Sequence, residues 1–405
     1  MAIEVRNITA DEVRGFRGNM RTVFGFGGSE DDDLVVQRFL DLVPLERTYA
    51  AFDGDVMVGT AAAFDFELTI PGAAIPMAGL TNVSVRATHR RRGVMSSMLA
   101  AHFDDVAKRG EALSGLWCSE AAIYGRYGYG SVGDSDVVTV DVPRMGIVSD
   151  HENDSASIVD ESRARELLPG LYDRVRVSRP GMLSRSEAWW NHRRFYDPPG
   201  SRRGLSARLY AVTSRGDEVT GYVVYRQRAK YDDGIASGAI EIVELYAIDA
   251  RAEVSLWRLL TSMDLYTTVK WWNAPTDSVL HWIVDDCRRV ERKRVDHLWL
   301  LISDVPAALS ARAYTSDGSI SLHVLHGNEN NTYKLDVVYG SGSCSPTDES
   351  AELHMDLAAL GSIYMGGVSP RALARAGRIL GDDAAIDKAE RLFSWPVAPW
   401  CPEVF

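Results

Sequence analysis

Features that mark several common classes of protein are scarce in this sequence. No apolar run approaches the roughly 18 residues that a membrane helix needs, and the start has no basic-then-apolar signal segment. The four cysteines lie far apart, without a CxxC pair or metal-like spacing. Asp and Glu outnumber Lys and Arg by 56 to 44, so the net charge of −12 argues against nucleic-acid binding. We therefore expect a cytoplasmic protein with free thiols, no metal, no membrane partner and no nucleic-acid partner. Secretion by a route without a signal peptide stays open.

The length and the remaining composition indicate a multidomain globular protein. The chain has 405 residues, of which 46% are hydrophobic and 25% charged. Such a length favours two or three domains, and such a composition has no signature of disorder. The negative charge favours cationic ligands by electrostatic steering.

Residues 1–150 alternate helix and strand patterns and are predicted to form an α/β domain. Helices are expected over 11–24, 33–43 and 95–109. Strands are expected over 47–52, 57–66, 78–85 and 113–118, with 137–142 as the closing strand. The polar, acidic stretch 149–163 predicts a domain boundary.

Residues 151–295 repeat this plan and are predicted to be a degenerate copy of it. A helix over 187–195 precedes strands over 207–213, 218–228 and 239–247, and a helix follows over 253–263. Where the first copy has a basic glycine turn, the second has the segment Ile248–Glu253 with two carboxylates. A duplicate of this kind has lost its phosphate site.

Residues 296–405 predict an α+β domain. Strands are expected over 298–302, 319–326, 332–338 and 350–356, and helices over 357–363, 370–376 and 384–393. The tail WPVAPWCPEVF holds three prolines and two tryptophans, which predicts a docked, extended segment.

The most informative stretch is residues 80–99, LTNVSVRATHRRRGVMSSML. A short apolar strand leads through a basic glycine turn into a helix. Helix N-termini leave N–H groups unpaired and carry partial positive charge, so this order suits a pyrophosphate. Gly93 permits close backbone approach, and the arginines add charge-assisted contacts. The alternative is a basic surface loop before an ordinary helix.

Two motifs together carry a family resemblance. The strand, the RRRGV turn and the helix resemble the acetyl-CoA site of GNAT acetyltransferases, and CSEAAIYGRYGYG (118–130) is similar to the narrower Eis, or "enhanced intracellular survival", family. The resemblance covers the whole chain. It implies two tandem GNAT-like domains, the second degenerate, and a sterol-carrier-protein-like C-terminal domain, with boundaries 1–150, 151–295 and 296–405.

The resemblance assigns roles to individual residues. It implies that Val83, Ser84 and Val85 hold acetyl-CoA along the strand and that Ser119 and Glu120 border its pantetheine arm. The pyrophosphate falls to the turn and the first helical residues, which are Arg90, Arg91, Arg92, Gly93, Val94, Met95 and Ser96. Tyr124 matches the general acid, and the terminal carboxylate of Phe405 matches the general base.

These imported roles suit the chemistry of amine acetylation. An amine with a pKa near 10.4 must lose a proton, and a terminal carboxylate with a pKa of roughly 3.5 anchors the cation and relays that proton through water. A thiolate whose thiol has a pKa of about 8.5 needs only modest help to leave, and a phenol with a pKa of about 10 can donate a hydrogen bond or a proton to it. His89 and Cys118 are interpreted as surface and core residues.

The family's acceptor pocket is aromatic and acidic. Phe24, Phe26, Trp400 and Glu403 are the candidate substrate-binding residues, and Asp31, Asp32 and Asp33 are candidates from charge alone. Phe26 and Val404 stand where an acidic residue is expected, which affects the substrate range more than the reaction.

The sequence thus predicts an acetyl-CoA-dependent N-acetyltransferase acting on amines of polycationic acceptors such as aminoglycosides, at one or several positions. The resemblance implies a homohexamer, a trimer of dimers. Two alternatives stay open. One is a protein lysine acetyltransferase, and the other is a regulatory protein that binds an apolar ligand in its C-terminal domain.

Overall fold

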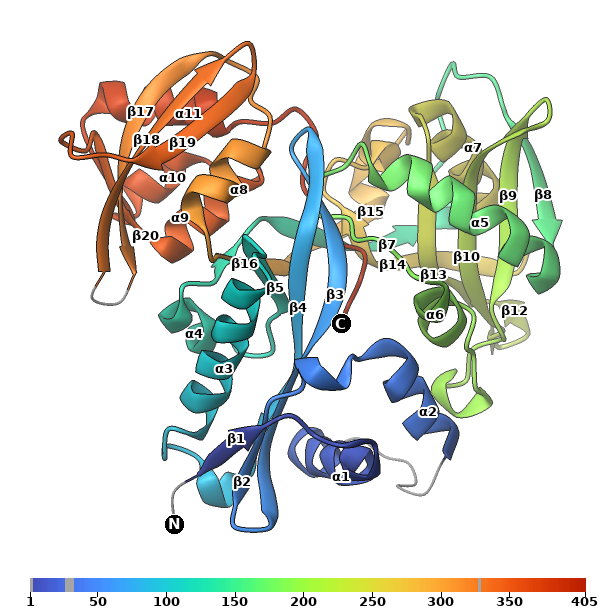
Figure 1. The fold of residues 1–405 in the computed structure, drawn as a ribbon. Coiled ribbons are helices and arrows are strands. Elements are labelled where there is room, and N and C mark those ends of the chain that lie inside the picture. The colour runs from blue at the N-terminus through green and yellow to red at the C-terminus, as the bar shows by residue number, and fades with distance from the viewer. Residues whose placement is uncertain (1–2, 26–32, 327–328) are drawn as a thin grey trace. The chain divides into compact units, whose positions relative to one another are not determined.

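The computed structural model describes residues 3–25, 33–326 and 329–405 (Figure 1). Contacts divide the chain into two compact units. Unit 1 comprises Met1–Val132, Leu298–Pro396 and Glu403–Phe405, and unit 2 comprises Gly133–His297 and Val397–Pro402. Among the described residues, every helix falls short of the length and hydropathy that a membrane crossing requires.

Unit 1 contains a seven-stranded sheet formed mainly by the N-terminal third of the chain. Its spatial order is β1 (Glu4–Arg6), β2 (Ala50–Asp53), β3 (Val56–Ile70), β4 (Ala73–Val85), β5 (Leu113–Trp117), β16 (Leu298–Ile302) and β6 (Gly130–Ser131). The helices of this part are α1 (Val13–Phe24), α2 (Asp33–Leu42), α3 (Val94–Lys108) and the short α4 (Ala121–Tyr124). The residues from Met57 to Phe64 on β3 are all buried, as expected for a central strand covered on both faces. Both α1 and α3 pack on β3 and β4 (Figure 1).

Unit 2 contains a second seven-stranded sheet. Its order is β8 (Ser155–Val159), β9 (Leu209–Arg215), β10 (Glu218–Arg228), β13 (Gly238–Ala247), β14 (Tyr266–Pro275), β7 (Asp134–Asp141) and β15 (Val290–Asp296). The helices are α5 (Glu161–Arg176), α6 (Glu187–Trp189), which continues as a π-helix over Trp190–Arg194, and α7 (Ala250–Thr261). A small hairpin joins β11 (Tyr231–Asp232) to β12 (Ile235–Ala236).

The two large sheets repeat one pairing scheme strand for strand. In each, the first three pairings are antiparallel, the fourth is parallel and the last two are antiparallel. The parallel pair is β4–β5 in unit 1 and β13–β14 in unit 2, and each is bridged by one helix, α3 or α7. The predicted internal duplication is therefore present in the topology.

Two strand assignments from the sequence were wrong. Residues 137–142 were expected to close the first sheet, but β7 pairs with β14 and β15 in the second. Residues 298–302 were expected in the C-terminal domain, but β16 lies between β5 and β6 in the first sheet. A strand from the segment predicted as the first domain thus belongs to the second sheet, and a strand from the segment predicted as the C-terminal domain belongs to the first. The three-domain division 1–150, 151–295 and 296–405 stays a prediction.

The rest of unit 1 is a smaller α+β layer. Its five-stranded sheet has the order β19 (Ser341–Pro346), β18 (Glu329–Val338), β17 (Gly318–His326), β20 (Leu353–Asp356) and β21 (Ile379–Leu380). Its helices are α8 (Val305–Ala311), α9 (Leu357–Tyr364), α10 (Pro370–Arg375) and α11 (Asp383–Phe393). Helix α9 also packs on β16 and β6 of the large sheet. The helices and the other strands predicted in this region are present.

Candidate active site

The first sheet opens between β4 and β5. These two strands pair only from Met77 to Gly79 on the β4 side, and β4 then continues to Val85 without a partner on β5. A cavity of about 380 Å³ lies beside this unpaired part of β4. Its walls are Val23, Phe24, Val83, Ser84, Val85, His89, Arg90, Arg91, Gly93, Val94, Met95, Ser96, Ser119, Glu120, Ile123, Tyr124, Arg126 and Tyr127. The sheet geometry therefore brings two motifs that are distant in sequence to one cavity.

The N-terminus of α3 forms one wall of this cavity and is free of side-chain caps. Its N-cap is Gly93, in the left-handed region at φ 79°, which has no side chain to cap the first turn. By contrast, Asp or Ser side chains cap α5, α6, α7, α8, α9, α10 and α11. The uncapped N–H groups at α3 remain available to an anion in the cavity.

Three arginines line the cavity beside this helix end: Arg90, Arg91 and Arg126. Arg92 is absent from the lining. Its guanidinium lies 3.5 Å from Asp53, which also contacts His89 at 3.2 Å. Uncapped helical N–H groups, guanidiniums and apolar walls on one cavity fit the pyrophosphate and the pantetheine arm of acetyl-CoA. Apart from Arg92, every predicted cofactor residue lies in this wall.

A β-bulge in β4 shapes the cavity floor. Thr60 of β3 pairs with Ser84 and Ala62 pairs with Thr81, so Asn82 and Val83 together oppose one residue of β3. Asn82 has a left-handed φ of 56°. A bulge leaves its extra residue outside the ladder and redirects the backbone, in this case at the strand segment that lines the cavity.

A buried hydrogen-bond chain supports this bulge. Thr60 Oγ1 donates to the Asn82 carbonyl at 2.8 Å and lies 2.7 Å from Ser84 Oγ. Asn19 of α1 donates its Nδ2 to Ser84 Oγ at 3.0 Å, and Arg86 Nε donates to Asn19 Oδ1 at 2.8 Å. The Ser84 hydroxyl is thereby engaged within the protein, and the cofactor contact of Ser84 stays a prediction.

Tyr124 enters the cavity from α4, directly after the Ser119–Glu120 segment. Its side chain is buried, 6% exposed, and its ring meets Tyr129 edge-on at 6.1 Å. Burial raises the pKa of the Tyr124 hydroxyl to about 12, and nearby Cys118 and Glu120 act in the same direction. At neutral pH this hydroxyl is therefore protonated and able to donate a proton or hydrogen bond into the cavity.

Several lining residues were not assigned to the cofactor site from the sequence. They include Val23, Ile123, Arg126 and Tyr127. The Tyr127 hydroxyl lies 2.9 Å from Ser96 Oγ and so links the IYGRYGYG segment to the first turn of α3. The IYGRYGYG segment that marks Tyr124 also contains Ile123, Arg126 and Tyr127. Which of these side chains face the cavity depends on the short helical turns over 121–127, which the sequence does not show.

The predicted substrate residues are distributed differently. Phe24 lines the cavity described above, whereas Phe26, Asp31 and Asp32 lie outside the described residues. Asp33 pairs with Arg14, and Glu403 is fully buried in unit 1.

Trp400 belongs to unit 2, where it is buried and packs on Tyr246 and Trp271. The substrate-binding roles of Phe24, Phe26, Trp400 and Glu403 stay predictions.

The C-terminal residue reaches the point where the first sheet opens. The Phe405 ring packs edge-on against Phe66, at 5.1 Å, and Phe64, at 6.4 Å, both on β3. It also lies next to Gly79, the last β4 residue paired with β5. Phe405 therefore sits beside the position from which β4 and β5 diverge around the cavity.

Family models match three segments of the chain. Acetyltransferase (GNAT) domain models match residues 4–132 and 181–302, and a sterol carrier protein domain model matches residues 305–402. These matches agree with the two sheets of one scheme and the smaller α+β layer.

Curated relatives extend over most or all of the chain. An uncharacterised N-acetyltransferase of Streptomyces coelicolor is 33% identical over 100% of both chains. The N-acetyltransferase Eis of Mycobacterium tuberculosis is 32% identical over 85% of this chain and 86% of its own. The chain therefore belongs to the Eis family of GNAT N-acetyltransferases, and it is an enzyme of that reaction class.

Solved structures share the full architecture. Eis1 from Mycobacterium abscessus superposes with a TM-score of 0.85 at 26% identity, covering 100% of both chains. A GCN5-related N-acetyltransferase from Anabaena variabilis has the same TM-score at 19% identity and full coverage, which shows a common fold.

Proposed function

We propose that this enzyme transfers an acetyl group from acetyl-CoA to amines of a polycationic small molecule, with aminoglycosides as the model acceptors. The observation that carries the proposal is the cavity at the opening of the first sheet. It combines an uncapped helix N-terminus, three arginines and the buried hydroxyl of Tyr124. Acetyl-CoA supplies the activated acetyl thioester, and GNAT acetyltransferases as a class use it.

In this proposal the turn and α3 bind the phosphates. Arg90 and Arg91, with the N–H groups of the first turn after Gly93, hold the pyrophosphate by charge-assisted hydrogen bonds. Val83, Ser84 and Val85 offer the backbone of β4 beyond the bulge to the pantetheine arm. Because of the bulge, backbone groups of β4 face the cavity. One backbone N–H there would stabilise the negative charge that develops on the carbonyl oxygen of the acetyl thioester.

Tyr124 is the proposed general acid. Its raised pKa, about 12, keeps the proton on the hydroxyl across the physiological range. A thiolate with a pKa of about 8.5 is a good leaving group, so a hydrogen bond or proton from Tyr124 is enough to assist its departure. Its rigid environment, with Tyr129 against the ring and Ser119 hydrogen-bonded to the hydroxyl, supports this role.

The carboxylate of Phe405 is the proposed base. Three aromatic and glycine contacts on β3 and β4 hold the terminal residue at the opening of the sheet. An ionised carboxylate at this point attracts an ammonium group and accepts its proton directly or through water. The net charge of −12 supports a cationic acceptor.

Two other functions stay open beside this proposal. A protein lysine acetyltransferase would use the same cavity with a peptide acceptor. A regulatory protein that binds an apolar ligand would use a different one, and a second cavity of about 290 Å³ is lined by α9, Trp299, Leu373 and the segment around Tyr129. The homohexameric assembly also stays a proposal.

The test is thiol release from acetyl-CoA by untagged protein with aminoglycosides, polyamines or lysine-rich peptides. We expect turnover with aminoglycosides, and mass spectrometry counts the acetyl groups gained by each molecule. Turnover with peptides alone would favour the lysine alternative. No turnover with any amine, despite binding of acetyl-CoA, would contradict the proposed acceptor class.

A further inference from the structure

The second GNAT domain has the same opening between strands as the first. Strands β13 and β14 pair from Gly238 to Ile242 on the β13 side, and both continue without pairing to each other beyond that point. Strand β13 also carries an irregularity between its pairings at Ile242 and Glu244, opposite β10. The corresponding place in the first domain is the cavity of Tyr124.

In the second domain, Trp400 of the C-terminal tail lies at this opening. Its ring is buried between Tyr246 of β13, at 5.6 Å, and Trp271 of β14, at 6.1 Å. Tyr246 lies beyond Ile242, the last β13 residue paired with β14. The Trp400 indole Nε1 donates to Asn273 Oδ1 at 3.3 Å, and Asn273 also lies beyond the paired part of its strand.

Other groups of unit 2 bind the backbone of the tail at Trp400 and Cys401. Asn273 Nδ2 donates to the Cys401 carbonyl at 3.0 Å, and the Trp400 N–H donates to the Pro180 carbonyl at 2.8 Å. Gly181, with φ 95°, approaches so closely that a Cβ there would lie 2.8 Å from the Trp400 backbone. The tail therefore presents peptide amides where the first domain would take the amide-containing pantetheine arm.

Side chains of unit 2 hold the tail at an earlier residue as well. Arg179 donates to the Ala398 carbonyl at 2.9 Å, and the Ala398 N–H donates to Asp277 at 3.3 Å. Arg179 also pairs with Asp277 at 2.8 Å. The segment is thus bound through several backbone groups and one anchoring aromatic side chain.

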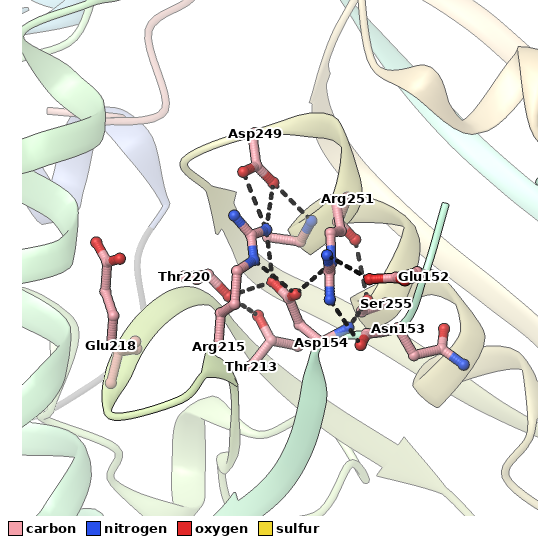
Figure 2. A network of polar contacts seen from close by, with 12 residues as sticks. Glu152, Asn153, Asp154, Thr213, Arg215, Glu218, Thr220, Asp249, Arg251 and Ser255 are labelled. Carbon is pink, nitrogen blue, oxygen red and sulfur yellow. Dashed lines mark hydrogen bonds and ion pairs between the residues drawn. The ribbon is translucent and has the colours of Figure 1, made fainter. Parts of the chain in front are cut away.

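At the N-terminus of α7, the helix that corresponds to α3, carboxylates of the chain itself occupy the place where a phosphate would bind (Figure 2). Asp249 caps α7, accepting from the Ala252 N–H at 2.9 Å. Buried Asp154 accepts two hydrogen bonds of 3.0 Å from Arg215, and Arg251 Nε lies 2.7 Å from its carboxylate. Thr220 donates to the same carboxylate at 2.7 Å, and Arg215 also contacts Asp249 at 3.0 Å.

In this network the guanidiniums of Arg215 and Arg251 are paired with Asp154 and Asp249 beside the helix N-terminus, and Arg251 also pairs with Glu152 at 2.9 Å. An incoming phosphate would have to displace a buried, multiply hydrogen-bonded carboxylate and would meet a second one at the cap. Both changes are unfavourable. The helix end that corresponds to the phosphate-binding end of α3 is therefore not available to a cofactor.

We infer that the second GNAT domain uses the opening between β13 and β14 as a receptor for the chain's own C-terminal segment, residues 397–402, and takes no acyl-CoA. The domain's function is then to anchor the tail that ends at Phe405. The inference rests on the proposed function in one respect, which is that acetyl-CoA is the cofactor of the first domain.

The experiment uses full-length, untagged protein and two independent readouts. Calorimetric titration with CoA gives the number of equivalents bound per chain. Alkylation by iodoacetamide, followed residue by residue with peptide mass mapping, reports release of the tail because Cys401 is fully buried next to Trp400. Exposed Cys287 is the positive control, and buried Cys344 in the sterol-carrier-like layer reports global unfolding.

The variants are Trp400→Ala and the milder Trp400→Phe. Trp282→Ala is the matched control, because Trp282 is a tryptophan of the same unit with 81% of its surface exposed. We expect one equivalent of CoA per wild-type chain. We also expect Cys401 alkylation at least about tenfold faster in Trp400→Ala, with Cys344 and the Trp282→Ala variant unchanged.

Two results would overturn the inference. One is binding of two equivalents of CoA per chain, and the other is unchanged protection of Cys401 in Trp400→Ala while Cys344 stays protected. If Trp400→Ala also exposes Cys344, the same criterion is applied to Trp400→Phe. A wild-type chain that binds no CoA would instead contradict the cofactor of the proposed function, and the alkylation readout would still test the docking of the tail.

Discussion

The ring of the last residue, Phe405, packs edge-on against the ring of Phe66 on β3, with 5.1 Å between their centroids. Aromatic packing of this kind holds the Phe405 ring at a defined place. In this protein the place is the point where β4 leaves β5, next to Gly79. The proposed role of the Phe405 carboxylate as the base depends on this placement of the residue.

A C-terminal extension tests this role. Residues added after Phe405 convert its carboxylate into a peptide carbonyl and displace the terminal charge. We expect kcat for amine acetylation to fall by about 10²–10⁴-fold, the range for a positioned acid or base, with the Kd for CoA unchanged. The same extension placed before Met1 is the control. Full activity in the C-terminally extended protein would exclude the carboxylate as the base.

The bulge of β4 gives a second prediction. Thr60→Val keeps the shape of the side chain but removes its hydrogen bonds to the Asn82 carbonyl and Ser84 Oγ. We expect the free energy of unfolding to drop by about 1–3 kcal/mol and the KM for acetyl-CoA to rise, because the cavity floor loses its support.

Thr69→Val on the same strand is the matched control. Thr69 is equally buried, but its hydroxyl has no hydrogen-bond partner within the described residues. This variant should leave both unfolding in denaturant and steady-state kinetics near wild type. Equal effects of the two substitutions would mean that the Thr60 hydrogen bonds do not hold the bulge.

A buried ion pair provides a stability prediction. Arg47 is fully buried and donates to both carboxylate oxygens of Glu111, at 2.9 and 2.6 Å, and it also pairs with Asp65 and Asp105. Arg47→Met leaves the buried Glu111 carboxylate without its cation. We expect a loss of about 3–5 kcal/mol of unfolding free energy, measured by chemical denaturation.

The partly exposed pair Arg6–Glu12 is the natural comparison, since it has the same two-bond geometry at 2.9 and 2.6 Å and side chains that are 39% and 29% exposed. Water solvates both of its partners, so Arg6→Met should cost less than about 1 kcal/mol. Similar losses for Arg6→Met and Arg47→Met would show that burial does not determine the strength of this cluster.

His102 predicts a pH dependence of stability. Burial, helped by the positive charge of Arg47, lowers the pKa of His102 to about 3, whereas an unfolded histidine titrates near pH 6.5. Between these values the unfolded chain binds a proton that the folded chain does not, so stability falls as the pH is lowered. By pH 5 the loss from this group is about 2 kcal/mol.

His102→Gln should remove that contribution. Urea unfolding at pH 7 and pH 5 measures the pH-dependent loss in both proteins, and the wild type should lose more. The comparison cancels the other titrating groups, including buried His297, whose pKa burial also lowers, to about 4. An identical loss in both proteins would mean that His102 takes up its proton in the folded state.

The residues predicted for the cofactor line one cavity, apart from Arg92, because the sequence signals that mark them are local. The RRRGV turn with its helix and the IYGRYGYG segment are each contiguous, so the residues that line the cavity are neighbours in sequence. Arg92 differs because the direction of a surface arginine depends on where Asp53 lies, on a strand far away in sequence.

The missed features depend on long-range pairing. The apolar residues of 137–142 and 298–302 indicate strands but carry no information on which of two similar sheets each strand joins. Trp400 is a candidate substrate-binding residue because the family's acceptor pocket is aromatic and acidic, and that role stays a prediction. Its contacts with Tyr246 and Trp271 in unit 2 became apparent only from the fold.

The most direct test of the account is the steady-state rate of Tyr124→Phe beside Tyr127→Phe, with acetyl-CoA and an aminoglycoside at saturation. Phenylalanine keeps the ring packing of Tyr124 but removes the hydroxyl. We predict that kcat falls by about 10²–10⁴-fold in Tyr124→Phe at an unchanged Kd for CoA. Tyr127→Phe, which loses the contact of the hydroxyl with Ser96, should mainly raise the KM for acetyl-CoA. A wild-type kcat in Tyr124→Phe would contradict the account, since the thiolate would then leave without an acid.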